Sequence, residues 1–409
     1  MKEILNKIKQ KEKIKYETLE KTFNNYLNNQ FEEEKMTEIL KCICSYGLCE
    51  ENVFDLTDIF IKSGTILEEN QSYIDKHSTG GVGDKTTLIV LPILASLGIK
   101  TVKMSGKALG YTGGTIDKLN SISVKTELEK DEIKKALEDC NMVISSQTKD
   151  LCPMDKKIYA LRDKTNTTNS IELIAISIMS KKLASGAGKI LIDIKVGNGS
   201  LVGTEQNARH LADLMIKIGK KYNKKVICML TKMNEPLGNN IGNKTEILEA
   251  IKILKNEEKN PLRTLSIEMA TIMYQMATEK PKKEAYHEVE RALNTEKAYQ
   301  TFKKYVTHQG GSLNIKLPSP RYLTSKKSGY IKEINAKEIG LICNELKEKN
   351  NKYNAGIILK VKKGDYIKKG KLLGEFYGNK KTDINKFYTS IKYSHFKTKT
   401  KDIIIDIIY

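Results

Sequence analysis

The sequence predicts an α/β fold: a helical lobe interleaved in sequence with a larger α/β sheet domain, plus a C-terminal α+β module. The sheet domain is predicted from strand-like apolar runs such as KILIDIKVG (189–197) and from the helical segments that alternate with them, such as QNARHLADLMIKIGKKY (206–222). The C-terminal module is predicted from a change in the sequence pattern after about residue 320, where short predicted strands with glycine turns and many lysines begin.

The elements follow in chain order. Residues 1–66 show helical periodicity, as in EEKMTEILKCICSYGL, and are expected to form the first part of the lobe. Residues 67–154 and 187–320 carry the strand candidates of the sheet domain, where ligands collect at the carboxyl ends of the strands. Residues 155–186 contain LIAISIM, whose apolar positions suit packing on the opening helices, so they form the second part of the lobe.

The C-terminal module is assigned to residues 321–409. Its segment GIILKVKKGDYIKKGKLLGEFYG resembles the strand-turn-strand unit of a biotinyl- or lipoyl-like barrel. No lysine flanked by methionines is present to carry a cofactor, so we expect a structural module.

Composition excludes several classes of protein. The 409 residues are 39% hydrophobic and 29% charged, which is typical of an ordered globular chain. The net charge of +20 comes mostly from evenly spread lysines without an arginine-rich stripe, so we expect no nucleic-acid partner and a small anionic substrate instead. The longest apolar run, LIVLPILASLGI, is shorter than a membrane span and no signal peptide is apparent, which predicts a cytoplasmic protein without a membrane partner. The seven scattered cysteines indicate reduced thiols.

The stretch KHSTGGVGDKTT (76–87) has the composition of an oxyanion site, because its glycines free the backbone N–H groups and its hydroxyls add small donors. Asp84 precedes Lys85 where a Walker A loop has glycine, and the GGVG spacing differs from a dinucleotide fingerprint. A plain structural turn accounts for this cluster alone about equally well. A second cluster, KMSGKALGYTGGTIDKL (103–119), repeats the same residue types, so we expect two donor-rich loops facing one cavity.

A third segment, residues 156–182, places Arg162, Ser177 and Lys181 on predicted lobe helices. Ser177 and Lys181 are four residues apart and share a helix face. Their apolar surroundings argue against simple surface charge.

The motifs DKHSTGGVGDK, MSGKALGYTGGTIDKL, YALRD and IMSKKLASGA resemble those of the thymidine and pyrimidine-nucleoside phosphorylases, and the resemblance covers nearly the whole chain. It implies a pentosyltransferase in which phosphate attacks C1′ of a pyrimidine nucleoside and releases the base and an α-pentose 1-phosphate. It further implies a homodimer, and closure of the lobe to bring the phosphate and base sites together.

The resemblance also implies the site residues. The phosphate-binding set is Lys76, Ser78, Gly80, Gly81, Thr87, Lys103 and Thr115. The pyrimidine-binding set is His77, Tyr159, Arg162, Ser177 and Lys181. Of these, His77, Arg162 and Lys181 are the expected catalytic residues. Arg162 and Lys181 can neutralise the charge that develops on the departing base, and His77 can donate a hydrogen bond to its other carbonyl.

Some members of this family hold a monovalent cation, and the matching positions here are Gly83, Lys85, Leu237, Asn240 and Glu249. Potassium is therefore a candidate ligand, although no cofactor is required, and an inward Lys85 could replace the ion with its own ammonium. The sequence departs from the family pattern at Lys107, Ala108, Tyr111 and Asn120, which puts catalytic efficiency in doubt more than reaction class.

Lys103 is the position that bears on substrate choice. The broad-specificity enzymes carry lysine there, so the leading expectation is cleavage of uridine, thymidine and deoxyuridine. The alternative is a thymidine phosphorylase restricted to deoxynucleosides. A phosphoribosyltransferase of the same fold, or a non-catalytic nucleotide or nucleic-acid binder, remains open at this point.

Overall fold

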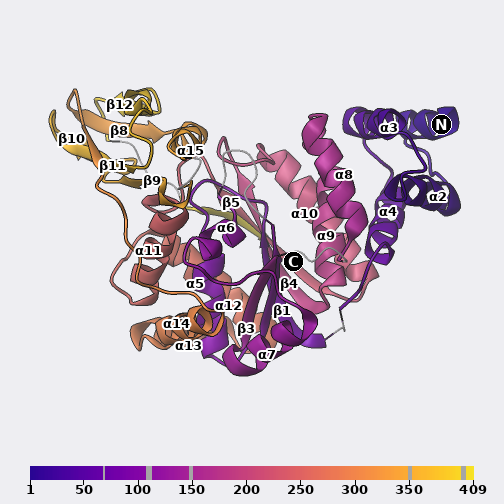
Figure 1. The fold of residues 1–409 in the computed structure, drawn as a ribbon, viewed down its shortest axis with the longest axis horizontal. Coiled ribbons are helices and arrows are strands. Elements are labelled where there is room, and N and C mark those ends of the chain that lie inside the picture. Colours follow the sequence, from indigo (N-terminus) through magenta and orange to yellow (C-terminus); the bar gives the residue numbers. More distant parts are fainter. Residues whose placement is uncertain (68–69, 107–112, 147–150, 349–351, 398–401) are drawn as a thin grey trace.

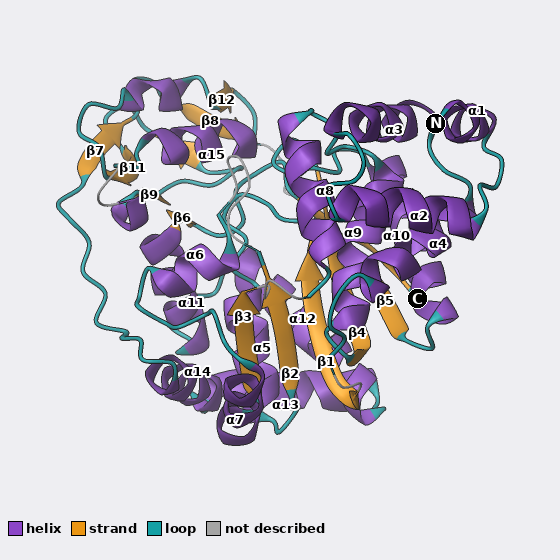
Figure 2. Cartoon of the chain, turned by 45° about the vertical axis from the view of Figure 1, so that its right-hand side comes forward, coloured by secondary structure: helices purple, strands orange, loops and turns teal. Residues whose placement is uncertain are grey.

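The computed structural model describes residues 1–67, 70–106, 113–146, 151–348, 352–397 and 402–409. A six-stranded sheet with the order β13-β5-β4-β1-β2-β3 lies at its centre (Figures 1 and 2). Its strands are β1 (Asn70–Ser78), β2 (Thr101–Ser105), β3 (Met142–Ser146), β4 (Ala187–Val196), β5 (Lys225–Lys232) and β13 (Ile404–Ile408).

The five strands β1 to β5 run parallel, and only β13 is antiparallel to its neighbour, β5. The predicted α/β class is confirmed, and the structure adds that the large sheet is mostly parallel. The carboxyl ends of β1, β2 and β4 consequently lie at one edge, which is where open α/β sheets bind their ligands.

Helices cover both faces of this sheet. One core contains the helices α1 (Lys2–Gln10), α2 (Tyr16–Leu27), α3 (Glu33–Tyr46), α4 (Glu50–Lys62), α8 (Pro153–Lys164), α9 (Ile171–Ala184) and α10 (Glu205–Lys221). The other core contains α5 (Thr87–Ser96), α11 (Asn243–Leu254), α12 (Pro261–Thr278), α13 (Lys282–Asn294) and α14 (Lys297–His308). Two further helices, α6 (Thr115–Asn120) and α7 (Lys130–Cys140), lie near β2 and β3.

Strand β4 shows how the two cores meet. Its residues Ile190, Ile192 and Ile194 belong to the core on the side of the N-terminal helices, whereas Leu191 belongs to the opposite core. Side chains of a strand point alternately to the two faces, so a strand that is buried on both faces must be apolar throughout. The N-terminal helices and α8 to α10 therefore share one core with the sheet, although they come from separate parts of the sequence.

The C-terminal module contains two antiparallel sheets, with the orders β6-β9-β11-β7 and β10-β8-β12. Its elements are β6 (Asn240–Gly242), β7 (Arg321–Thr324), β8 (Gly329–Ile334), α15 (Ala336–Glu345), β9 (Gly356–Leu359), β10 (Tyr366–Ile367), β11 (Leu372–Tyr377) and β12 (Ile391–Ser394), with short 3₁₀ turns at Lys352–Asn354 and Ile384–Tyr388. The likeness to a biotinyl or lipoyl barrel stays a prediction.

The two ends of the predicted module differ from the structure. Strand β6 pairs with β9 and so joins the module, although it lies far earlier in the sequence. The last strand, β13, leaves the module and pairs with β5 in the large sheet. The isoleucine-rich sequence of β13 did not indicate which strand it pairs with, because an edge position in the large sheet or in the module would bury such residues equally well.

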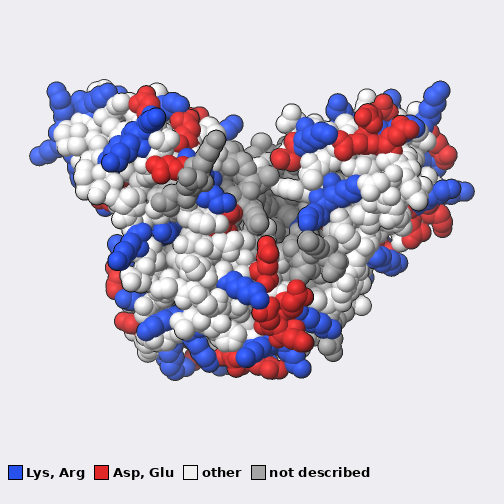
Figure 3. All heavy atoms as spheres, viewed as in Figure 1, with Lys and Arg blue, Asp and Glu red and all other residues white. Residues whose placement is uncertain are grey.

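Figure 3 shows both signs of charge distributed over one face of the molecule, with a hollow between the C-terminal module at the upper left and the helical lobe at the upper right. In the described part of the chain, no helix has both the length and the apolar character needed to cross a membrane.

Candidate active site

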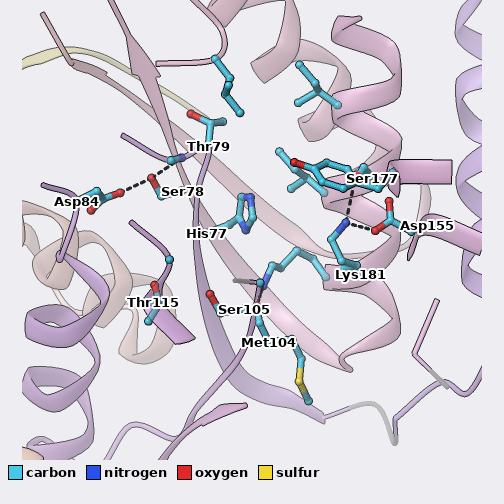
Figure 4. A pocket seen from close by; sticks show the side chains of 18 of the residues that line it. His77, Ser78, Thr79, Asp84, Met104, Ser105, Thr115, Asp155, Ser177 and Lys181 are labelled. Atoms are coloured by element: carbon cyan, nitrogen blue, oxygen red, sulfur yellow. Dashed lines mark hydrogen bonds and ion pairs between the residues drawn. The ribbon is translucent and has the colours of Figure 1, made fainter. Parts of the chain in front are cut away.

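A cavity of about 480 Å³ lies between the carboxyl ends of β1 and β2 on one side and the helices α8 and α9 on the other. Figure 4 shows His77 in the middle of this space. One wall contains Ser78, Gly80, Gly81, Asp84, Thr87, Lys103, Gly113, Gly114 and Thr115. The other wall contains Asp155, Tyr159, Arg162, Ser177 and Lys181. The predicted phosphate and base residues thus face one cavity, with the exception of Lys76.

The first loop follows β1 and is packed tightly against β4. Gly80 and Gly83 adopt positive φ angles of 87° and 79°, and a Cβ at Gly81 would lie only 2.5 Å from Met233 Cε. The backbone N–H of Thr79 donates to Asp193 O at 3.0 Å. The glycines are therefore needed both for the turn and for the close approach of the backbone.

Asp84 is a functional residue that the sequence reasoning did not select. Its carboxylate accepts a hydrogen bond from Ser78 Oγ at 2.5 Å and others from the N–H and Oγ1 of Thr86 at 3.1 and 2.7 Å. Burial would raise the pKa of Asp84, but Lys76, Lys195 and the two hydroxyls hold that pKa well below its ordinary value. Asp84 is thus an ionised group that orients the hydroxyl groups of the loop.

Lys76 lies behind the loop and does not line the cavity. Its fully buried Nζ donates to Thr86 Oγ1 at 2.6 Å and is 3.8 Å from Asp193 Oδ2. Burial lowers the pKa of Lys76, whereas Asp84 and Asp193 act in the opposite direction. In this arrangement Lys76 neutralises the carboxylates beneath the loop.

Lys103 does reach the cavity wall from β2, and its Nζ donates to Lys76 O at 2.8 Å. Burial, followed by the charge of Lys182, lowers the pKa of Lys103 well below its ordinary value. The Lys182 ammonium is in turn paired with Asp75 at 2.7 Å.

The second loop presents Gly113, Gly114 and Thr115, and α6 begins at Thr115. Lys118, which the sequence reasoning also missed, connects the two loops because its Nζ donates to Asp84 O and Gly113 O, each at 3.0 Å. The same ammonium forms a buried ion pair with Glu246 at 3.2 Å. A lysine inside a helix gives no local signal of such a role.

Three of the four departures from the family pattern, Lys107, Ala108 and Tyr111, lie outside the described residues. The fourth, Asn120, accepts a hydrogen bond from Thr126 Oγ1 at 2.9 Å.

On the opposite wall, Lys181 Nζ donates to Ser177 Oγ at 2.7 Å and forms an ion pair with Asp155 Oδ2 (Figure 4). The predicted four-residue spacing thus brings Ser177 and Lys181 into contact on α9. Asp155, on α8, was not predicted. It is 3% exposed, and it fixes the direction of the Lys181 ammonium.

Arg162 is 2% exposed and donates to three backbone carbonyls, two in the connection between α8 and α9 and one in the first turn of α9. Its acceptors are Thr167 O at 3.1 Å, Leu173 O at 3.1 Å and Thr168 O at 3.0 Å. Burial lowers the pKa of Arg162. Three of the five guanidinium donors therefore hold the connection and the first turn of α9, and the other two have no acceptor among the described residues.

His77 lies between the two walls, and its Nδ1 has no hydrogen-bond partner within the described part of the chain. Burial and the nearby ammonium groups, Lys182 first among them, lower the pKa of His77 well below 6.5. At neutral pH the imidazole is therefore uncharged and has one N–H donor.

At the candidate cation site, the side-chain ammonium of Lys85 lies where a monovalent cation was considered. Lys85 Nζ donates to Leu237 O at 2.8 Å, Asn240 O at 2.9 Å and Glu249 Oε2 at 2.6 Å. A Cβ at Gly83 would be 2.5 Å from Leu237 O. These residues do not fit a bound ion, because the ammonium of Lys85 already takes the oxygens that would surround one.

Comparisons with known proteins agree with this geometry. Residues 70–299 match the glycosyl transferase family a/b domain, and residues 330–394 match the pyrimidine nucleoside phosphorylase C-terminal domain. The chain is 36% identical to pyrimidine-nucleoside phosphorylase of Geobacillus stearothermophilus over 412 residues, which covers 95% of each chain. It is 37% identical to the enzyme of that name from Bacillus subtilis, with 90% of each chain covered, and 36% identical to thymidine phosphorylase of Mycoplasmoides pirum, with 91% of this chain and 94% of the relative covered.

A crystal structure of anthranilate phosphoribosyltransferase from Thermus thermophilus is similar in fold, with a TM-score of 0.60 and 14% identity over 75% of this chain and 99% of that one. At this identity the likeness shows the fold alone. The match to the C-terminal domain and the relatives that align over nearly the whole chain distinguish a pyrimidine-nucleoside phosphorylase from a phosphoribosyltransferase. The chain belongs to the pyrimidine-nucleoside phosphorylase family.

Proposed function

We propose that this protein is a pyrimidine-nucleoside phosphorylase that cleaves uridine, thymidine and deoxyuridine with phosphate to the free base and α-(deoxy)ribose 1-phosphate. The observation that carries the proposal is the single cavity with two unlike walls, one rich in hydroxyls and backbone donors and the other containing Ser177, Lys181 and Arg162. A nucleoside that spans the cavity would place its sugar between an anion site and a base site.

The donors of the first wall suit phosphate. Ser78, Thr87 and Thr115 present hydroxyl groups, and the glycines at 80 and 81 allow the backbone to approach closely. Ser78 Oγ donates its only proton to Asp84, so in this arrangement it can only accept a hydrogen bond from a protonated phosphate oxygen. The hydroxyl donors to phosphate are then Thr87 and Thr115, which are held on the cavity wall at the starts of α5 and α6. Such preorganised donors need little rearrangement when phosphate attacks C1′.

The second wall suits the departing base. Cleavage of the glycosidic bond develops positive charge on the sugar and negative charge on the pyrimidine. Lys181 and the two remaining donors of Arg162 can stabilise that negative charge, and the neutral imidazole of His77 can donate one hydrogen bond to a carbonyl oxygen of the base. Phosphate itself is the nucleophile, so no covalent intermediate with the protein is needed.

The test is phosphate-dependent release of base from thymidine and from uridine. Thr115→Val is expected to raise the KM for phosphate about tenfold, and Ser177→Ala the KM for the nucleoside by a similar factor, because each removes one hydrogen bond to one substrate. Thr307→Val, at an exposed threonine of α14, is the matched control. Absence of base release from both nucleosides by the wild-type protein would refute the proposal.

The alternative is a thymidine phosphorylase restricted to deoxynucleosides. Lys103 lies on the cavity wall, where its Nζ could form a hydrogen bond with a 2′-hydroxyl, which favours the broader substrate range. Lys103→Met should then reduce turnover of uridine more than that of thymidine. Wild-type protein that cleaves thymidine but not uridine would support the restricted enzyme instead.

We further propose that the protein is a homodimer that requires no cofactor. A light-scattering mass equal to one chain would contradict the dimer, and loss of activity after exhaustive dialysis against a chelator would contradict the second statement.

A further inference from the structure

Lys85 lies in the phosphate loop, yet its side chain points away from the cavity. It is 1% exposed and does not line the cavity. Its ammonium instead reaches a segment that lies more than 150 residues later in the sequence, where it contacts Leu237 O, Asn240 O and Glu249 Oε2. A lysine ammonium has three N–H donors, and each of them has an acceptor here.

Glu249 is equally well satisfied. Besides Lys85, its carboxylate accepts hydrogen bonds from Asn239 N at 2.6 Å, Asn240 N at 2.9 Å and Asn260 Nδ2 at 3.1 Å. Burial would raise the pKa of Glu249, but the charge of Lys85 and these hydrogen bonds lower it overall, so the group stays ionised. The pair is therefore a closed arrangement of one cation and one anion with few unused donors or acceptors.

This arrangement joins the phosphate loop to the C-terminal module. Leu237 N donates to Val82 O at 3.0 Å, and the Val82 side chain belongs to the hydrophobic core of the module. Strand β6, which begins at Asn240, pairs with β9 of the module. Lys362, also from the module, donates to Gly238 O, and burial lowers the pKa of Lys362 to about 8.

The position of Lys85 in the loop gives it a direct effect on the cavity. The next two residues are Thr86, which is hydrogen-bonded to Asp84 and Lys76, and Thr87, which begins α5 and lines the cavity. Displacement of the Lys85 backbone would shift these hydroxyls, and a small shift of a donor is enough to weaken binding of an anion.

We propose that the Lys85 ammonium is a built-in cation that fixes the phosphate loop against the C-terminal module, so that this protein needs no bound monovalent cation at this position. Lys85 is a positioning residue, because it acts on phosphate through Thr86 and Thr87. The proposal goes beyond the phosphorolysis reaction, and the measurements of thermal stability that test it do not require the protein to catalyse that reaction.

The experiment compares wild type, Lys85→Ala, Lys85→Met and the control Lys252→Met, which alters an exposed lysine of α11. Each protein is studied in potassium chloride and in tetramethylammonium chloride at equal ionic strength. The readouts are the thermal unfolding midpoint and the KM values for phosphate and nucleoside. Potassium can enter the space left by Lys85→Ala, whereas the methionine chain fills that space without charge.

We expect wild type and Lys252→Met to change less than about twofold in any KM between the two salts, since no small cation is needed. Both Lys85 variants should show a phosphate KM raised about tenfold or more in tetramethylammonium, with a smaller change for the nucleoside. Potassium should restore the phosphate KM of Lys85→Ala to within about threefold of wild type and raise its unfolding midpoint by roughly 5 °C, but should not rescue Lys85→Met.

Several-fold activation or thermal stabilisation of the wild-type protein by potassium would overturn the proposal, and this measurement stands even if both variants fail to fold. An unchanged phosphate KM in Lys85→Met would overturn the positioning role. If wild type showed no phosphorolysis, the reaction would be refuted, while the potassium dependence of the unfolding midpoint of Lys85→Ala would still test the built-in cation.

Discussion

The two walls of the cavity are built in different ways. The phosphate wall is formed by loops that follow β1 and β2, and side chains from β4, α6 and α11 brace these loops from behind. The base wall consists of side chains from two adjacent helices, α8 and α9, which are joined by the ion pair between Asp155 and Lys181. The phosphate wall is therefore preorganised by many elements, whereas the base wall depends on a few side chains of the lobe.

The two walls also differ in how the charge of their carboxylate is compensated. The phosphate wall contains an ionised carboxylate, Asp84, which would repel phosphate if it were not balanced by the nearby Lys76 and Lys195. The base wall has one carboxylate, Asp155, which is paired with the residue expected to contact the base. This contrast indicates that substitutions behind the phosphate wall should mainly affect stability and phosphate affinity, and that substitutions in the base wall should mainly affect nucleoside binding and turnover.

The largest effect is expected for Lys181→Met. It removes the ammonium that stabilises the departing base and leaves Asp155 without its ion pair, so kcat/KM for thymidine should fall about a thousandfold. Steady-state kinetics at saturating phosphate measure this change. Lys164→Met, at an exposed lysine near the end of α8, is the control. A fall of less than tenfold would show that Lys181 is not a main contributor to catalysis.

The next largest effect is expected behind the phosphate wall. Lys118→Met should lower the free energy of unfolding by about 3–5 kcal/mol, because it leaves the buried Glu246 carboxylate without its partner. The phosphate KM should rise roughly tenfold as the link between Asp84 and Gly113 is lost. Denaturant unfolding and initial rates measure the two quantities.

The double variant Lys118→Met/Glu246→Gln separates these two contributions. Stability should recover in large part because no unpaired charge remains, whereas the phosphate KM should stay high. Recovery of both quantities would show that Lys118 has a purely structural role.

A smaller effect is expected for Asp155→Asn. The amide oxygen can still accept a hydrogen bond from Lys181, but the charge that orients the ammonium is gone, so kcat/KM for the nucleoside should fall about tenfold. The phosphate KM should remain within about twofold of wild type if the two walls act separately. An equal change in both substrates would contradict the separation of the walls.

The smallest effect concerns pH. The pKa of His77 is lower in the folded protein than its ordinary value of 6.5, so the unfolded chain binds the proton more readily in the interval between them. The contribution of His77 to stability is thus complete above pH 6.5 and is lost as the pH falls toward the folded pKa. The unfolding midpoint of wild type should therefore decline more steeply below pH 6.5 than that of His77→Gln. Parallel curves would refute a neutral His77 in the folded protein.

Local sequence was enough to predict that two donor-rich loops line one cavity, because glycine and small hydroxyl residues have few other reasons to cluster twice in succession. It also predicted the contact between Ser177 and Lys181, since helical geometry fixes which residues four apart are neighbours. The alternation of apolar segments predicted the sheet for the same reason, as the periodicity of side chains is a local property.

The roles of several charged residues could not be predicted, because the sequence does not show which hydrogen-bond acceptors or opposite charges lie beside them. Arg162 was expected to contact the base, but three of its donors are used by backbone carbonyls in the connection between α8 and α9 and in the first turn of α9. Lys76 carries the charge expected for phosphate, yet it lies behind the loop against Asp193. Asp155 and Lys118 gave no signal at all, because a charged residue on a helix is most often exposed to solvent.

The sequence by itself determined the α/β class, the two donor-rich loops and the family, because these follow from periodicity and from motifs that are contiguous in the chain. Tertiary structure alone decided that Val82 belongs to the core of the C-terminal module, that β13 returns to the large sheet, and that Lys85 meets two carbonyls and a carboxylate from a distant segment. The physical reason is that backbone carbonyls are present at every residue, so only the packed fold determines which of them point at a given ammonium.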